Sequence, residues 1–349
     1  MQAIPYMQIR GGSSKGVYFH KNDLPAEIEA RDQILLDALG RDARQIDGLG
    51  GANSLTSKVG IISVSDRDDA DIDYLFVQVV VGENRVDTTP NCGNILAGVG
   101  AFALESGLLP IQGDLTTVRV FMVNSSKLCA LDIQTPYGRV AYAGDARIDG
   151  VPGTSAPITC NYLDVAGSIC GSLLPTGQVR DVIDNIPVTC IDNGMPVVVL
   201  RAQDLGKTGN ETPQALNDDP EFRQRLESIR LQAGPLMNLG DVSDKVVPKM
   251  SLIAAPQSGG HVSTRTFIPH HCHTAIGVLG AVSVATACIL KGSVAEGVAQ
   301  VPAGNPMKVS VEHPSGEFSV ELGMDDDGNV NKVGLLRTAR LLSRGELYV

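Results

Sequence analysis

The chain has 349 residues, a length that favours two domains over a single core. Its formal net charge of −11 argues against nucleic acid or an anionic membrane as a partner, because both bind basic surfaces. No apolar run approaches the roughly 18–20 residues that span a bilayer, and no charged start followed by an apolar stretch predicts a signal peptide. Seven cysteines without regular spacing are typical of reduced thiols, so we expect a cytoplasmic protein.

The first half of the chain predicts a strand, a helix, a strand and a second helix. Residues 17–24 form an apolar strand that runs into a polar turn, and residues 31–40 an amphipathic helix ended by a glycine. A second apolar strand follows at residues 58–63. Residues 95–104 are apolar or small on every side, which indicates a buried helix.

The second half of the chain repeats this order of elements. The counterparts of the four segments are residues 198–205, 222–234, 249–254 and 275–290, and Pro-Gly turns at residues 133–138 and 311–316 follow in each half. We therefore expect two copies of one unit, residues 1–186 and 187–349, with the last strand as a candidate to return to the first domain. Two unrelated α+β domains remain an alternative. In a duplicated protein the ligand is expected in the cleft between the copies.

The strongest chemical signal is Asn91-Cys92-Gly93-Asn94 at the entrance of the first buried helix. Free amides and the positive end of the helix dipole stabilise a thiolate, and the amides of Gly93 and Asn94 can bind a carboxylate beside it. A buried structural cysteine is the alternative reading.

Two polar loops earlier in the chain are candidate anion sites. Residues 10–16 contain the donors and small residues of an anion-binding loop but lack the spacing of a nucleotide P-loop. Residues 50–58 gather glycines and hydroxyls before Lys58, which opens an apolar strand. An edge lysine is usually solvated, but partial burial would favour its neutral amine and make it a usable base.

The run His270-His271-Cys272-His273 precedes the second buried helix. Contiguous residues do not supply the spacing of a tetrahedral metal site, so we expect no metal here. The favoured reading is a set of substrate donors at the second helix entrance, with Arg265 nearby as a bidentate clamp for a carboxylate.

These motifs resemble the methylaconitate isomerase and 4-oxalomesaconate tautomerase family, which has the diaminopimelate epimerase-like fold. The resemblance covers essentially the whole chain and rests on residues 10–16, 45–51, 55–59, 73–76, 91–94 and 148–154. It implies an α+β fold of two pseudo-symmetric domains, each a barrel-like, mostly antiparallel sheet around a central buried helix.

The resemblance also implies a cofactor-independent isomerase that moves a proton on a small unsaturated di- or tricarboxylate, by a keto-enol or allylic 1,3-shift. It favours the oxalomesaconate tautomerases of aromatic acid degradation. Lys58 would be the base and Cys92 the acid. The residues expected to bind the substrate are Ser13, Ser14, Ser57, Asn91, Gly93, Asn94, Arg265 and His273.

Three alternatives remain open: a methylaconitate or methylitaconate isomerase, an amino-acid racemase that uses Cys92 and Cys272, and a non-catalytic ligand-binding protein on the same fold. The sequence His-Cys-His-Thr around Cys272 departs from the Cys-Gly-Ser-Gly pattern of the epimerases, which counts against the racemase. The expected partner is a small polycarboxylate, and a homodimer is left open.

Overall fold

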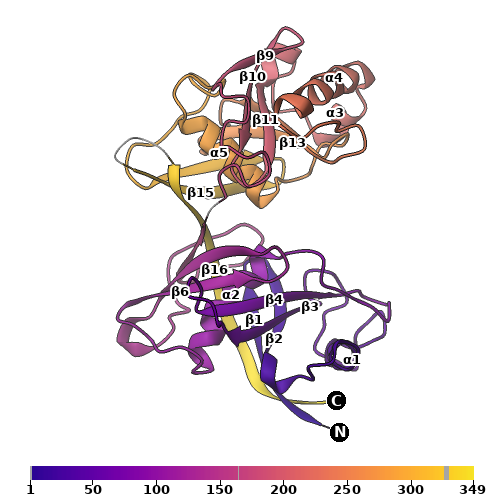
Figure 1. The fold of residues 1–349 in the computed structure, drawn as a ribbon, viewed down its shortest axis with the longest axis vertical. Helices are drawn as coiled ribbons and strands as arrows, with labels where there is room; N and C mark the ends of the chain where they lie inside the picture. The colour runs from indigo at the N-terminus through magenta and orange to yellow at the C-terminus, as the bar shows by residue number, and fades with distance from the viewer. Residues whose placement is uncertain (1, 164, 326–329) are drawn as a thin grey trace. The chain divides into compact units, whose positions relative to one another are not determined.

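The computed structural model describes residues 2–163, 165–325 and 330–349. They divide into two compact units (Figure 1). The first unit comprises Met1–Leu163 together with Leu335–Val349, and the second comprises Asp164–Gly334.

The first unit is built on strands and contains two α-helices among its described residues. Its elements are β1 (Ala3–Gly11), β2 (Ser14–His20), η1 (Lys21–Asp23), α1 (Ile28–Leu39), β3 (Lys58–Val64), β4 (Ile72–Val79), β5 (Val86–Asp87), α2 (Gly93–Glu105), β6 (Leu115–Met122), β7 (Lys127–Gln134), η2 (Pro136–Gly138), β8 (Pro157–Tyr162) and most of β16 (Val330–Tyr348).

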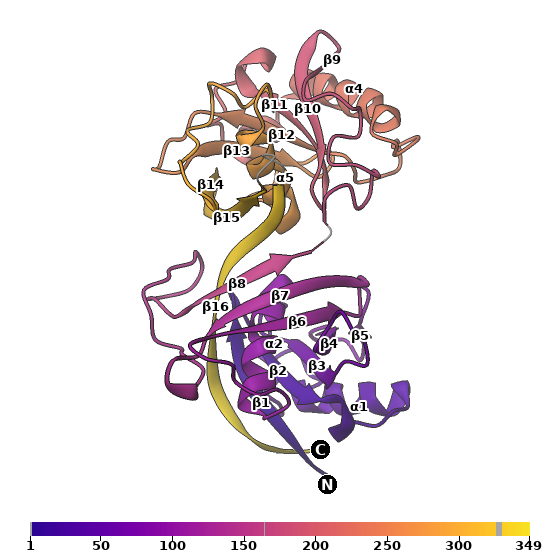
Figure 2. The same cartoon turned by 60° about the vertical axis from the view of Figure 1, so that its left-hand side comes forward.

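Eight of these strands close into a barrel in the order β1-β2-β3-β4-β6-β7-β8-β16, and β16 pairs with β1 to complete it. The closing pair is antiparallel and runs from Ala3 opposite Tyr348 to Gly11 opposite Ala339. Two pairs, β2–β3 and β4–β6, are parallel. Helix α2 packs against β1, β2, β3, β4 and β7, and the two ribbon views show it inside the ring of strands (Figures 1 and 2).

Helix α2 can lie inside the barrel because its surface is apolar and narrow. Every residue from Ile95 to Leu104 is buried. A Cβ atom at Gly98 would lie 2.4 Å from the Tyr18 hydroxyl, and one at Gly100 would lie 2.2 Å from Ile133 Cδ1. Only glycine permits this close approach to the barrel wall.

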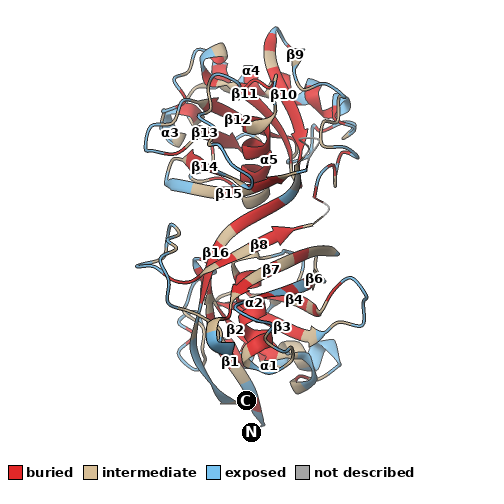
Figure 3. Cartoon of the chain, turned by 90° about the vertical axis from the view of Figure 1, so that its left-hand side faces the viewer, coloured by how far each residue is buried: buried red, intermediate tan, exposed pale blue. Residues whose placement is uncertain are grey.

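The other helix, α1, covers the outside of the barrel. Its buried face (Leu35, Leu36 and Leu39) belongs to an apolar cluster with residues of β2, β3 and β4. Along β6 and β7, buried residues alternate with more accessible ones, because one face of each strand points into the barrel and the other points outward (Figure 3).

The elements of the second unit repeat the main strands and helices of the first in the same order, with one more strand at the start and one more short helix. They are β9 (Asp181–Ile183), β10 (Ile186–Asp192), β11 (Pro196–Arg201), η3 (Ala202–Leu205), α3 (Pro213–Asn217), α4 (Pro220–Leu236), β12 (Lys249–Ala254), β13 (Val262–Phe267), α5 (Val278–Ile289), β14 (Met307–His313) and β15 (Gly316–Met324), followed by the first residues of β16.

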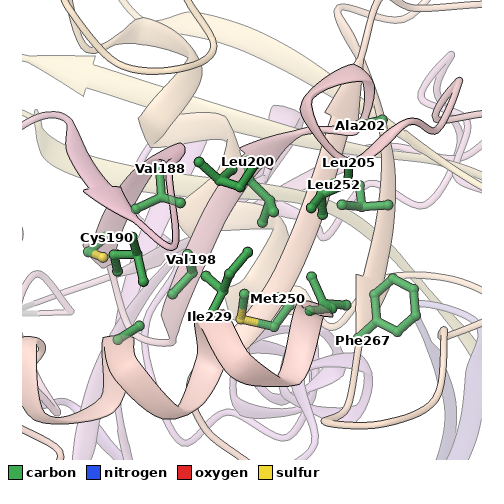
Figure 4. Packing of buried hydrophobic residues seen from close by; sticks show 14 of the residues in the cluster. Val188, Cys190, Val198, Leu200, Ala202, Leu205, Ile229, Met250, Leu252 and Phe267 are labelled. Atoms are coloured by element: carbon green, nitrogen blue, oxygen red, sulfur yellow. The ribbon is translucent and has the colours of Figure 1, made fainter. Parts of the chain in front are cut away.

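The sheet of the second unit runs in the order β15-β14-β13-β12-β11-β10-β9. Helix α4 buries Phe222, Leu226 and Ile229 in an apolar cluster with residues of β10, β11 and β12 (Figure 4). Helix α5 packs against β10, β11, β14 and β15. Its residues from Gly280 to Cys288 are all buried, as in α2.

The predicted α+β fold of two related units is confirmed. In both units a hairpin precedes a parallel pair (β2–β3 and β11–β12), and a second parallel pair (β4–β6 and β13–β14) flanks the buried helix. The pairing of β1 with β16 returns the end of the chain to the first unit.

Three details differ from the expectations. The units divide after Leu163 rather than after residue 186, because β9 pairs with β10 inside the second unit. The two Pro-Gly turns are not equivalent: Pro314 lies in the β14–β15 hairpin, whereas Pro136 begins η2, from which a long loop leads to β8. Helix α5 begins at Val278, later than expected.

Candidate functional site

Cys92 is the N-cap residue of helix α2, in extended conformation with φ −136° and ψ 101°. Its amide donates to Asn91 Oδ1 at 2.9 Å and its carbonyl accepts from Leu96 N at 3.0 Å. No side-chain cap hydrogen bond is formed at this helix start. The thiol is half-buried, whereas the other six cysteines are buried. The first amides of α2 therefore lie beside a partly accessible sulfur, as an anion site at a helix start requires.

The Ser13-Ser14 turn and the first turn of α2 are held together by side chains. Asn94 Nδ2 lies 3.1 Å from Ser13 Oγ and 3.3 Å from Ser14 Oγ. The approach is tight, since a Cβ atom at Gly11 would lie 2.2 Å from the Asn94 carbonyl oxygen. Gly12 (φ +52°) has the left-handed conformation that favours glycine. The structure thus brings together three of the predicted substrate-binding residues and places Gly93 as the first residue of α2.

Three buried tyrosines surround the entrance of α2. The Tyr18 hydroxyl donates to the Ile95 carbonyl at 2.7 Å, and the Tyr74 hydroxyl donates to the Cys92 carbonyl at 3.3 Å. A Cβ atom at Gly93 would lie 2.8 Å from the Tyr162 hydroxyl. Burial raises the pKa of all three phenols well above the ordinary value; the charge of Cys92 raises that of Tyr18 and Tyr74 further, and the charges of Cys129 and Cys160 raise that of Tyr162. The hydroxyls of Tyr18 and Tyr74 therefore stay protonated and donate to backbone carbonyls of the first turn of α2.

Lys58 is the first residue of β3, and its side chain is buried, 9% exposed. Nζ donates to Gln78 Oε1 at 2.8 Å and lies 5.1 Å from the centroid of the Phe76 ring. Gly16 pairs with Lys58 across β2 and β3, and a Cβ at Gly16 would lie 3.0 Å from the Lys58 carbonyl and 2.9 Å from Ile95 Cδ1. The start of β3 is therefore next to the first turn of α2.

Two other predicted residues are engaged by their own neighbours. Asn91 Nδ2 donates to Ser125 Oγ at 3.1 Å, which ties the residue before Cys92 to the β6–β7 turn. The Ser57 hydroxyl is fully buried and donates to Gln45 Oε1 at 2.6 Å. Ser57 thus stabilises the loop before Lys58.

The remaining predicted residues lie in the second unit. Arg265, on β13, is 9% exposed and donates to the carbonyls of Glu211 (2.6 Å) and Thr264 (2.8 Å). Burial lowers its pKa. His273 Nδ1 accepts from the Ala275 amide at 2.8 Å.

Cys272 does not occupy a helix entrance, which corrects the prediction. It lies five residues before Gly277, the N-cap of α5, and forms an isolated bridge with Phe267. Its amide donates to Asn217 Oδ1 at 2.8 Å. Burial raises the pKa of its thiol to about 11. A buried, protonated thiol is a poor partner for the two-cysteine chemistry of a racemase.

None of the three tyrosines was predicted as a site residue, and neither was Gln78, the partner of Lys58. Tyr18, Tyr74, Gln78 and Tyr162 lie on strands β2, β4 and β8, in runs that read as ordinary strand. Only Tyr74 carried a signal, since it falls in a stretch shared with the family resemblance.

Within the described residues, no group of three or more His, Cys, Asp or Glu side chains is placed to hold a metal ion. The expectation that the protein needs no metal remains a prediction. In the same part of the chain, no helix has the length and apolar character needed to cross a membrane.

Comparisons with known proteins identify the family of the chain. A family model described as PrpF protein matches residues 1–349. The 4-oxalomesaconate tautomerase of Pseudomonas putida is 58% identical over 347 residues, which cover 99% of this chain and 96% of that protein. The (4E)-oxalomesaconate Delta-isomerase of Novosphingobium sp. (strain KA1) is 55% identical over 350 residues, covering 100% and 98%.

More distant relatives also align from end to end. The 3-methylitaconate isomerase of Eubacterium barkeri is 36% identical over 370 residues, covering 99% of this chain and 97% of that protein. The crystal structure of a methylitaconate-delta-isomerase has a TM-score of 0.90 at 33% identity, covering 100% of this chain and 96% of that chain. The chain belongs to the PrpF protein family and, like these relatives, is an isomerase.

Proposed function

We propose that this protein is a 4-oxalomesaconate tautomerase that moves a proton between two carbons of its substrate, or between carbon and oxygen, without a cofactor. The observation that carries the proposal is 58% and 55% identity, over nearly the whole chain, to two proteins named for action on 4-oxalomesaconate. The geometry at the entrance of α2 supports it, because a thiol, free helix amides and a buried lysine lie on adjoining elements.

In the proposed reaction Lys58, as a neutral amine, removes a proton from a carbon next to a carbonyl or alkene. That C–H bond breaks, the electron pair moves along the conjugated system, and Cys92 donates a proton at the far end. The lysine ends protonated and the cysteine ends as a thiolate, so one proton transfer between them restores the enzyme. Acid–base chemistry of this kind needs groups within hydrogen-bond reach of the substrate.

The surroundings of Cys92 support its role as the acid. The dipole and first amides of α2 would stabilise the thiolate that the reaction leaves, and Tyr18 and Tyr74 hold this first turn through its carbonyls. The residues proposed to hold the substrate carboxylates in the first unit are Ser13, Ser14, Asn94 and the amide of Gly93. Ser57 and Asn91 would position them. For Arg265 and His273, which lie in the second unit, a role as substrate donors stays a prediction.

The direct test is conversion of 4-oxalomesaconate by the purified protein in deuterium oxide. We expect a change in the ultraviolet absorbance of the conjugated system and incorporation of solvent deuterium at one carbon, seen by NMR. A Cys92→Ser variant should lose both signals. A protein that binds the compound but exchanges no hydrogen would contradict the proposal and favour a non-catalytic binding role.

A methylitaconate or methylaconitate isomerase is the second candidate, favoured by the TM-score of 0.90 to a methylitaconate isomerase structure. The same two residues would then catalyse an allylic shift on a smaller dicarboxylate. A panel of unsaturated di- and tricarboxylates separates the two candidates through kcat/KM. A tenfold preference corresponds to about 1.4 kcal/mol of transition-state binding.

We also propose that the protein works in the cytoplasm and that no metal takes part. All seven cysteines lie in the described residues and are free thiols, which suits a reducing compartment. Cell fractionation tests the first statement. Activity lost on chelation and restored by a defined metal would refute the second.

A further inference from the structure

A recess in the first unit is lined in part by Ser13 and Ser14 and also contains cationic residues that the proposed reaction does not use. Its volume is about 560 Å³, within the range of small-molecule sites. Three of its lining residues are cationic, namely Arg10, Lys15 and Arg340. Among the described residues that line it, none is Asp or Glu. The recess is therefore a concentration of positive charge in a protein with a net charge of −11.

Arg10 is fixed in place by the backbone and hydroxyls around it. Its guanidinium donates to the carbonyls of Gly12 (2.9 Å) and Thr338 (3.1 Å) and to Ser155 Oγ (3.2 Å). Burial lowers its pKa and the charge of Arg340 lowers it further, so the two guanidinium groups repel each other. No carboxylate pairs with either group in the described part of the chain.

The other two cations are free to meet a ligand. Arg340, on β16, is exposed, and Lys15 is half-exposed at the start of β2. Neither side chain has a hydrogen bond or ion pair with a described residue. The carboxylate of Glu105 does not neutralise the recess, since it accepts from the Tyr142 hydroxyl at 3.2 Å and pairs with Arg344 at 3.5 Å.

The recess adjoins the residues proposed for the reaction. Ser13 and Ser14 line it and also contact Asn94, two residues after Cys92. Thr56, which precedes Ser57 and Lys58, lines it as well. A ligand that reaches from the α2 entrance past the two serines would meet Lys15 and Arg340.

We propose that this recess binds the carboxylate at the far end of a polycarboxylate substrate, with Lys15 and Arg340 as its specificity-determining residues and Arg10 as the positioning residue beneath them. The proposal rests on the proposed function in one respect only, namely that the anion bound in the recess is part of the substrate. A fixed arginine and two cations without a described partner in this recess would discriminate a tricarboxylate from a dicarboxylate, because the third carboxylate gains charge-assisted hydrogen bonds.

The test measures binding of tricarballylate, a saturated tricarboxylate that cannot react, and of glutarate, a saturated dicarboxylate, by titration calorimetry. The variants are Arg340→Gln and Lys15→Gln. Arg67→Gln is the matched control. Lys58 begins β3, whereas Arg67 lies in the loop after the other end of β3 and pairs with Asp69. Each recess variant should weaken tricarballylate binding roughly tenfold or more, as expected for a lost charged hydrogen bond. Glutarate binding and the control variant should change much less.

Kinetics give the second measurement. On an unsaturated tricarboxylate, the recess variants should raise KM with little change in kcat, because they remove binding that the ground state and transition state share. Wild-type affinity for tricarballylate in both recess variants would overturn the inference. So would inorganic phosphate that binds through Arg340 without competing with tricarballylate, since the recess would then hold a separate anion.

The two proposals can fail separately. If the wild type isomerises no polycarboxylate yet binds tricarballylate through Arg340, the proposed function is refuted and anion binding in the recess is kept. If the wild type isomerises a polycarboxylate and Arg340→Gln does so with the same KM, the recess proposal is refuted and the proposed function is kept.

Discussion

Replacement of Lys58 by methionine should abolish most of the turnover while leaving the fold intact. Nζ makes one described hydrogen bond, to Gln78 Oε1 at 2.8 Å, and lies 5.1 Å from the Phe76 ring centroid. A neutral side-chain hydrogen bond contributes about 0.5–1.5 kcal/mol, and removal of a buried polar group offsets part of that loss. Methionine has similar length, so we expect the free energy of unfolding to change by about 1–2 kcal/mol at most.

That change is small against the roughly 5–15 kcal/mol that stabilises a typical fold, so the variant should remain folded. A positioned base contributes about 10²–10⁴-fold, equivalent to about 3–5 kcal/mol of activation free energy. The expected result is a fall of that size in kcat with little change in KM. The assay follows the absorbance of the conjugated substrate and deuterium uptake, with circular dichroism to check the fold.

Lys249→Met is the matched control because Lys249 holds the corresponding place in the second unit. It is the first residue of β12, is 9% exposed like Lys58, and has its pKa lowered by burial and then by Arg230. Its loss should leave kcat within a few fold of wild type. Near wild-type kcat in Lys58→Met, or an equal loss in both variants, would refute the assignment of Lys58 as the base.

Three further predictions concern thiols and packing. Cys92→Ser should lower kcat by about 10²–10⁴-fold, whereas Cys272→Ser should keep the wild-type kcat. Equal losses of racemase activity in the two variants would instead support the two-cysteine mechanism. Gly11→Ala should destabilise the protein by about 1–3 kcal/mol and weaken substrate binding, because its Cβ would lie 2.2 Å from the Asn94 carbonyl oxygen; an unchanged melting temperature and KM would contradict this. Burial raises the pKa of Cys190 from 9.0 to about 12, so its stabilising contribution is complete below pH 9 and is lost as pH rises toward 12. Urea unfolding should give a lower free energy of unfolding at pH 10.5 than at pH 8, and the difference should be smaller in Cys190→Ala. An equal difference in wild type and variant would contradict this prediction.

The sequence predicted those features that depend on local pattern. The apolar run of α2 could only be buried, and the glycines within it allowed a close approach to surrounding strands. The order of strands and helices in both halves followed from apolar runs and from a helix-ending glycine such as Gly40, which has φ +91°. The placement of Cys92 as an N-cap followed from the change from polar to apolar residues at that point.

Other features could not be predicted because they depend on long-range contacts or on a local competition. Tyr162 and Arg340 reach the site region from strands far along the chain, and no local pattern marks them. The start of α5 was placed too early because residues 275–277 are as small and apolar as the helix that follows. The extended conformation of Gly277 (φ −69°, ψ 146°) delays the helix, and Asn217 holds Cys272 outside it.

The pairing of β1 with β16 has a consequence for how the chain folds during synthesis. Ala3 is opposite Tyr348, so nearly the whole chain must leave the ribosome before the barrel can close. Until then β1 and β8 are open edges, each with a row of unpaired backbone groups that can recruit another strand. Contacts this distant in sequence also slow folding. The nascent first unit, which carries Lys58 and Cys92, therefore waits in an unclosed and aggregation-prone state for its last strand, and chaperones have their greatest opportunity to act on it during that interval.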